Sequence, residues 1–300
     1  MQIRDILEVV GFAAIQEENE SIGDLMKRVL SIQDISCIGK CSQTIALPII
    51  SALGSEAVIL PTALLSSHTI FPGFTFKDLS DQIGPITRHW KEQDIRFDAI
   101  YSGYLGSIGQ IDMVKEIWSM FREDDTLVIV DPVMADHGVL YKGFDMDYVR
   151  KNTELCAGAD IIVPNITEAC LMTGTEFREE HDEAYVRELL AKTTELGARI
   201  TVLTGVSLEQ GMTGVIGYDR AEDETFIYQN RKIDATFHGT GDLFSSTVVG
   251  ELMKGKSWKD AFRIASDYTA YTIEVTMRDP HKPWYGVDFE TTIPYLINAE

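Results

Sequence analysis

The stretch "FHGTGDLFSSTVVGEL" (residues 237–252) is the part of the sequence that decides the fold. It places a polar, glycine-rich step directly before a run that predicts a buried helix. A helix start needs only one capping side chain, yet Gly239, Thr240, Gly241 and Asp242 stand there together. Glycines let backbone N–H groups approach a ligand without Cβ obstruction, and a helix N-terminus favours negative charge. The stretch therefore predicts an anion site at a helix N-terminus.

Asp242 needs its own explanation, because a carboxylate and a bound phosphate repel each other. It fits the role of a general base that takes the proton from an attacking hydroxyl, while the N–H groups hold a transferring phosphoryl group. The alternative is an aspartate that only stabilises the helix dipole.

Composition limits the possible partners. The chain has 300 residues, of which 45% are hydrophobic and 24% are charged, and this is ordinary usage for one globular domain. Its formal net charge of −21 excludes a broad contact with nucleic acid or an anionic membrane. Any phosphate site must therefore be local.

Short apolar runs alternate with longer amphipathic runs, which predicts an α/β fold with a largely parallel sheet. The segment 66–78 is rich in aromatic residues and glycine and is expected to form either a flap over a cleft or a plain surface loop. The expected strands are 28–33, 57–61, 98–103, 126–132, 160–165 and 200–205, with a hairpin at 213–219 and 225–230. The expected helices are 42–53, 78–91, 109–121, 145–154, 182–196, 241–254 and 257–276.

Polar side chains follow several of these strands, where parallel sheets bind their ligands. They are Asp34, Tyr104, Asp131, Asp136, Asn165, Glu168 and Thr204. Asn165 and Glu168 in "NITE" share one helix face and could hold a hydrated Mg²⁺. The competing explanation is a capping box, in which the same two residues cap the helix.

The cysteines, the length of the apolar runs and the N-terminal sequence predict a cytoplasmic protein. Cys37, Cys41, Cys156 and Cys170 lack the spacing of a zinc site and are expected to be reduced. No run reaches the roughly 20 apolar residues of a membrane helix, and the N-terminus lacks a signal-peptide pattern. Residues 1–25 carry six acidic residues and one arginine. We expect Met26 to be the natural start, with residues 1–25 an accessory helix or an over-long reading frame and 26–300 a single domain.

Together, "GTGD", "NITE", "DPVMAD" and the opening "VLSIQD" resemble the ribokinase superfamily. "SIQ", the "HT" of "SSHT" and the "GY" of "YSGYLGS" narrow the resemblance to the pyridoxal and pyridoxamine kinases. It runs from about Lys27 to the C-terminus. It implies a three-layer fold with a small flap, and an ATP-dependent kinase acting on the 5′-hydroxyl of B6 vitamers.

Carried over residue by residue, the resemblance makes Asp242 the base and Gly239, Thr240 and Gly241 the anion hole. It assigns Asn165, Thr204 and Asp131 to the ATP phosphates, and Glu168, Asp131 and Asp136 to Mg²⁺. Asp34, His68, Thr69 and Tyr104 fall at the B6 ring. The resemblance also implies a homodimer and a site for a monovalent cation, K⁺.

The sequence departs from the family pattern at two positions. Asp34 stands where relatives commonly have serine, and Val163 where many have threonine. A carboxylate at the ring accepts well from an ammonium, which predicts a shift of preference toward pyridoxamine. Two other functions stay open: a hydroxymethylpyrimidine kinase, and a non-catalytic ligand sensor on the same fold. His238 could approach a phosphate or be an ordinary loop histidine.

Overall fold

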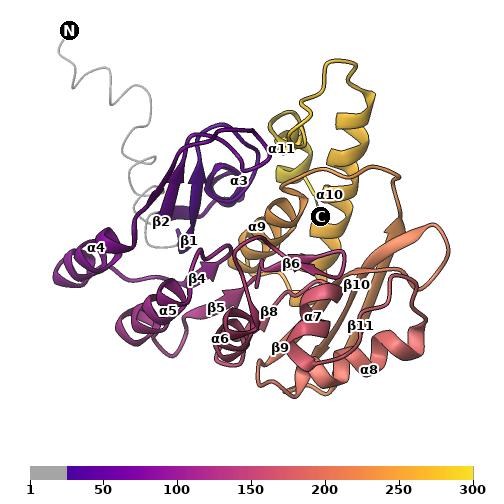
Figure 1. Cartoon of the computed structure of the whole chain (residues 1–300), viewed down its shortest axis with the longest axis horizontal. Helices are drawn as coiled ribbons and strands as arrows, with labels where there is room; N and C mark the ends of the chain where they lie inside the picture. The colour runs from indigo at the N-terminus through magenta and orange to yellow at the C-terminus, as the bar shows by residue number, and fades with distance from the viewer. Residues whose placement is uncertain (1–25, 300) are drawn as a thin grey trace, which may run out of the picture.

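A nine-stranded sheet forms the middle of the molecule (Figure 1). The computed structural model describes residues 26–299, so the expected N-terminal extension at 1–25 lies outside the described residues. The strands are β1 (Arg28–Ser36), β2 (Glu56–Leu65), β3 (Phe76–Asp78), β4 (Ala99–Ser102), β5 (Leu127–Val130), β8 (Ile161–Ile162), β9 (Ile200–Val206), β10 (Met212–Asp219) and β11 (Glu224–Arg231). Their order across the sheet is β11-β10-β9-β8-β5-β4-β1-β2-β3.

The six strands from β2 to β9 in this order are parallel, which confirms the predicted largely parallel sheet. The predicted hairpin is present as β10 and β11, which pair antiparallel at one edge. β8 is shorter than predicted. The following Val163 still donates its amide to Val130, but Pro164 has no N–H to continue the ladder.

The predicted helices are present, as is the helix that "NITE" begins, and a further short helix lies near the C-terminus. They are α3 (Gln43–Ala52), α4 (Ser80–Glu92), α5 (Ile108–Phe121), α6 (Met146–Cys156), α7 (Ile166–Thr173), α8 (Glu183–Thr194), α9 (Thr240–Met253), α10 (Trp258–Arg278) and α11 (Phe289–Ile297). Side chains of α4, α5 and α6 pack on one face of the sheet, and α7 and α8 continue that layer over β9 and β10. Helices α3, α9 and α10 cover the other face, so the fold has three layers (Figure 1).

The segment 66–78 folds back onto the sheet instead of ending in a free loop. Its last residues form β3, which pairs antiparallel with the end of β2. The Phe71 ring near its tip lies 4.6 Å from the Trp284 ring and 5.3 Å from the Tyr285 ring. A further hairpin of β6 (Ala135–Asp136) and β7 (Val139–Leu140) was not predicted, because two residues a strand are too few to show an alternating pattern.

The four cysteines are free in the structure, with Cys37 exposed and the other three buried. Within residues 26–299, no helix has both the length and the apolar character that crossing a bilayer requires.

Helices α3 and α9 approach closely because α9 carries a glycine at their contact. A Cβ added at Gly250 would lie 2.9 Å from the Leu53 Cβ, where α3 ends. Gly84 in α4 offers a matched comparison, because its Cβ would meet only the flexible end of Arg88, at 3.1 Å. Alanine favours a helix over glycine by about 1 kcal/mol at either position.

We expect Gly250→Ala to lower the free energy of unfolding by about 1–3 kcal/mol, because the added methyl group overpacks the α3–α9 contact. Gly84→Ala should keep or raise the stability. Thermal unfolding of both variants followed by circular dichroism checks this. Equal melting temperatures for the two variants would contradict the packing argument.

Candidate active site

Four carboxylates converge at the carboxyl ends of the parallel strands. They are Asp34 in β1, Asp131 directly after β5, Glu168 in α7 and Asp242 in α9. The charges of Asp131 and Asp34 both raise the pKa of Asp242, and the charge of Asp131 raises the pKa of Glu168. The structure thus brings together acidic residues that lie more than 200 positions apart in the sequence.

The GTGD turn has the geometry of an anion cradle. Gly239 is the N-cap of α9 with φ 80°, a left-handed conformation that favours glycine. A Cβ at Gly239 would strike the Lys40 carbonyl oxygen, whereas a Cβ at Gly241 would meet nothing within 4 Å. Gly239 is therefore required by packing, and Gly241 leaves open space beside the first-turn amides, which have no partner within a helix.

Asp242 is half-buried in the first turn of α9. Burial raises its pKa to about 7, with further increases from the charges of Asp131 and Asp34, while the nearby Ser42 backbone amide lowers it. A carboxylate with a pKa near neutrality can accept a proton and release it again at physiological pH. This is the property that a general base at this position needs.

Asp131 is held by a hydroxyl and followed by a strained backbone. Ser245 donates its hydroxyl to Asp131 Oδ2 over 2.7 Å. Two residues after Asp131, Val133 has φ 36°, which is rare for a β-branched residue. Burial raises the pKa of Asp131.

Asn165 and Glu168 form the capping box that the sequence left as one alternative. Asn165 Oδ1 accepts from the Glu168 amide, and Glu168 Oε2 accepts from the Asn165 amide, both over 2.9 Å. Glu168 Oε1 accepts from the Met134 amide over 2.8 Å. Thr204 in β9 forms a β-bridge with Asn165, so these two predicted phosphate residues lie side by side.

The three predicted magnesium ligands differ in solvent exposure. Glu168 is 2% and Asp131 is 9% exposed, whereas Asp136 lies on the surface of the β6–β7 hairpin and its Oδ1 accepts from the His137 amide. Within the part of the chain that the structure describes, no group of three or more histidine, cysteine, aspartate or glutamate side chains is placed to hold a metal ion.

Of the other residues predicted at the ring, Tyr104 lies within electrostatic range of Asp34. Asp34 accepts from Ser42 Oγ over 2.6 Å and from Ser36 Oγ over 3.2 Å. Burial and the charge of Asp34 raise the pKa of Tyr104. His68 is half-buried with its ring 4.7 Å from the His238 ring, and burial together with His238 lowers the pKa of His68 to about 4. Thr69 is exposed in the turn that follows.

The structure adds three residues that sequence reasoning missed. Ser42 donates its hydroxyl to Asp34, Tyr101 lies fully buried near Asp131 and Asp242, and Tyr141 lies within electrostatic range of Glu168, Asp136, Asp131 and Asp242. Of these three, only Tyr101 could have been predicted from the sequence, because it lies near the end of an expected strand. Val163, the departure from the family pattern, is buried in an apolar cluster beneath the site.

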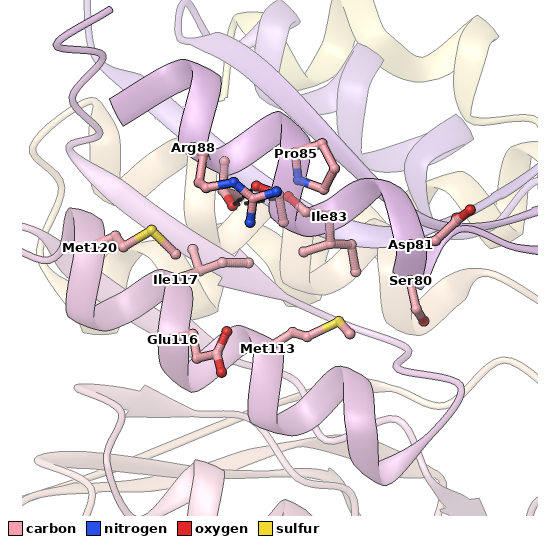
Figure 2. A pocket seen from close by; sticks show the side chains of 11 residues that line it. Ser80, Asp81, Ile83, Pro85, Arg88, Met113, Glu116, Ile117 and Met120 are labelled. Carbon is pink, nitrogen blue, oxygen red and sulfur yellow. Dashed lines mark hydrogen bonds between the residues drawn. The ribbon is translucent and has the colours of Figure 1, made fainter. Parts of the chain in front are cut away.

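A cavity of about 340 Å³ lies elsewhere, between α4 and α5 (Figure 2). Figure 2 shows the Arg88 guanidinium, Met113 and Met120 around it. None of the predicted site residues lines it. Its position gives it no direct part in the chemistry of the strand ends.

The chain is similar in sequence and fold to known kinases. The model of the phosphomethylpyrimidine kinase family matches residues 86–284. The chain is 29% identical to a pyridoxine/pyridoxal/pyridoxamine kinase of Bordetella avium over 268 residues, which cover 84% of this chain and 86% of the relative. It is similar to the pyridoxal kinase structure from Lactobacillus plantarum with a TM-score of 0.82 at 28% identity, covering 90% of this chain and 96% of that chain. A Bacteroides thetaiotaomicron structure with pyridoxal gives a TM-score of 0.85 at 34% identity, with the same coverage.

Burial of Glu168 makes stability depend on pH. Burial and Asp131 raise the pKa of Glu168 to about 8, above the value of about 4.3 in an unfolded chain. Between these values the native state binds a proton that the unfolded state releases, so stability is lost as the pH rises toward 8. Glutamine cannot titrate. We therefore expect Glu168→Gln to gain stability relative to wild type between pH 5 and pH 8, by up to about 1.4 kcal/mol per pH unit.

Denaturant unfolding of both proteins at several pH values measures this difference. Only the change of the difference with pH matters, because glutamine also loses one acceptor for a backbone amide. Parallel stability curves for the two proteins would show that Glu168 is ionised in the native state.

Proposed function

Since the chain belongs to the phosphomethylpyrimidine kinase family, we propose that it transfers the terminal phosphoryl group of ATP to the 5′-hydroxyl of pyridoxal, pyridoxamine and pyridoxine. The observation that carries this proposal is Asp242, which lies in the first turn of α9 beside the open space over Gly241. The names of the relatives support the substrate class: the Bordetella avium protein is a kinase of all three vitamers, and the Bacteroides thetaiotaomicron structure contains pyridoxal.

The reaction follows from the position of each group. The substrate hydroxyl oxygen attacks the γ-phosphorus of ATP, and its proton passes to the Asp242 carboxylate. A bond forms between that oxygen and phosphorus, while the bond from phosphorus to the β,γ-bridging oxygen breaks. The amides of Gly239, Thr240 and Gly241 stabilise the charge on the transferring group. The products are ADP and the phosphorylated vitamer.

The residues at the strand ends fit a hydrated Mg²⁺. Asp131 and Glu168 are buried carboxylates whose pKa values are raised by burial and, for Glu168, also by the charge of Asp131, and oxygen donors are what Mg²⁺ prefers. Both already accept hydrogen bonds from the protein, so we propose that they hold the ion mainly through its water ligands, with Asp136 at the rim. When bound, the ion would neutralise charge on the ATP phosphates.

Asn165 and Thr204 are proposed to contact those phosphates, and His68, Thr69 and Tyr104 the ring. The segment 66–78 makes two ring contacts, His68 with His238 and Phe71 with Trp284. These contacts support its role as a flap. A K⁺ requirement, the homodimer and the cytoplasmic location stay predictions.

Asp242→Ala is expected to lower kcat on B6 vitamers by about 10²–10⁴-fold, because the hydroxyl then has no base. In the wild type, kcat/KM should fall about tenfold per pH unit below a pH of about 7, where Asp242 becomes protonated. Coupled ATP turnover with pyridoxal, pyridoxamine, pyridoxine and hydroxymethylpyrimidine, measured side by side, checks both points.

The same set of four substrates distinguishes the proposed function from the two alternatives, a hydroxymethylpyrimidine kinase and a ligand sensor. Turnover of the pyrimidine alone would leave the GTGD argument intact and overturn the vitamer assignment. Binding of a vitamer without turnover in the wild type would favour the ligand sensor.

The buried carboxylate of Asp34 predicts an amine preference within this activity. Asp34 makes no ion pair in the part of the chain that the structure describes, so the ammonium group of pyridoxamine would supply its missing cation. We expect Asp34→Ser to lower the ratio of kcat/KM for pyridoxamine to that for pyridoxal by about tenfold, corresponding to about 1.4 kcal/mol. Equal ratios in the two enzymes would exclude this role.

A further inference from the structure

Lys40, in the loop between β1 and α3, contacts both the GTGD turn and the segment before α11. A Cβ at Gly239, the N-cap of α9, would strike the Lys40 carbonyl oxygen, so the two backbones are in direct contact. The Lys40 side chain has a second close contact, because a Cβ at Gly286 would lie 2.6 Å from the Lys40 Cβ and 3.2 Å from its Cδ. Two glycines far apart in the sequence therefore make room for this one residue.

The Lys40 ammonium is held by two carboxylates at the start of α11. Nζ donates to Asp288 Oδ1 over 2.9 Å and to Glu290 Oε2 over 2.7 Å, and it lies 5.6 Å from the centre of the Phe289 ring. The side chains of Lys40 and Asp288 are only 14% and 16% exposed, so water screens this pair less than a pair on the surface. Phe289 is buried in an apolar cluster with side chains of α3, α9 and α10, which fixes the segment that carries both carboxylates.

The position of Gly239 matters because the helix that would hold the phosphoryl group begins there. The Leu243 amide donates to the Gly239 carbonyl over 2.9 Å, which is the first intrahelical bond of α9. The amides of the preceding residues have no partner within the helix and are the donors of the proposed anion site. Such donors stabilise a developing charge only when they are already in place. A loop that holds Gly239 therefore also holds these donors.

We propose that Lys40 is a positioning residue for the GTGD turn: its bonds to Asp288 and Glu290 hold its carbonyl against Gly239 and so keep the first-turn amides of α9 in place for the transferring phosphoryl group. This inference rests on the proposed function, in which those amides bind that group. Lys40 contacts no reacting atom and acts through Gly239. The alternative is an ammonium that leaves both carboxylates and binds the ATP phosphates directly.

The first experiment compares the steady-state kinetics of Lys40→Met, Lys40→Arg and Lys27→Met with the wild type. Lys27 is the matched control, because it lies just before β1 and forms an ion pair of 2.7 Å with Asp98. Lys40→Met should lower kcat for every vitamer by the same factor, about tenfold or more, with the KM for ATP little changed. Lys40→Arg keeps the charge and should recover most of the loss. A kcat as high in Lys40→Met as in Lys27→Met would overturn the inference.

A double variant, Asp288→Asn with Glu290→Gln, separates the tether from direct binding of ATP. It removes both charged partners and leaves the Lys40 ammonium free to reach a phosphate. A positioning role predicts a lower kcat, as in Lys40→Met. A wild-type kcat in the double variant, with a raised KM for ATP in Lys40→Met, would make Lys40 a ligand of ATP and overturn the inference. The double variant also serves if Lys40→Met does not fold.

A second measurement is independent of turnover. Amide hydrogen exchange of Leu243, followed by NMR in the ligand-free protein, reports on the bond to Gly239, and the Ile100 amide in the centre of the sheet is the reference for global unfolding. Exchange of Leu243 relative to Ile100 should be about tenfold faster in Lys40→Met and unchanged in Lys27→Met.

The two measurements distinguish the inference from the function on which it rests. Unchanged exchange of Leu243 in Lys40→Met overturns the inference even if the wild type phosphorylates B6 vitamers. Faster exchange of Leu243 with no vitamer turnover in the wild type would overturn the proposed function and support the link between Lys40 and the GTGD turn.

Discussion

The proposed active site depends on holding Asp34, Asp131, Glu168 and Asp242 together without a cationic side chain to balance them. Within residues 26–299, none of the four forms an ion pair with lysine, arginine or histidine. Lys40 is a cation in the loop after β1, but its Nζ bonds to Asp288 over 2.9 Å and to Glu290 over 2.7 Å. Backbone amides and hydroxyls therefore stabilise the carboxylates, and burial with mutual repulsion raises their pKa values. A site built in this way is prepared for cations that arrive with the substrates.

Backbone strain occurs close to these carboxylates. Ser42 and Val133 both have positive φ: Ser42 donates its hydroxyl to Asp34 over 2.6 Å, and Val133 lies two residues after Asp131. A hydroxyl supplies hydrogen bonding without net charge, so it holds a carboxylate without competing with a bound cation. The surrounding fold keeps the strain in place. Lys40 connects the loop after β1 to two other segments. Its carbonyl packs against Gly239, and its side chain bonds to Asp288 and Glu290 at the start of α11.

The sequence predicted the elements whose signals are local. The α/β alternation, the terminal hairpin and the helix at GTGD follow from apolar periodicity and glycine placement, and the structure confirms them. Residues such as Asp131 and Thr204 could be named because strand ends meet at one edge of a parallel sheet. Ser42 could not be found in this way. Its hydroxyl bond to Asp34 depends on how the loop after β1 folds, and an irregular loop leaves no periodic pattern in a single sequence.

The sequence offered a capping box or a magnesium ligand at Asn165 and Glu168 as alternatives, but the geometry makes them compatible. The capping box holds both oxygens of Glu168 by backbone amides, which fixes its position and leaves it near Asp131. Burial and Asp131 favour the protonated form of Glu168, and a nearby hydrated Mg²⁺ would favour its charged form, with several waters that can bridge to it. The cap therefore supplies the rigidity that a water-mediated site requires. A cation bound there would lower the pKa of Glu168, so that Glu168 would release its proton as the ion binds.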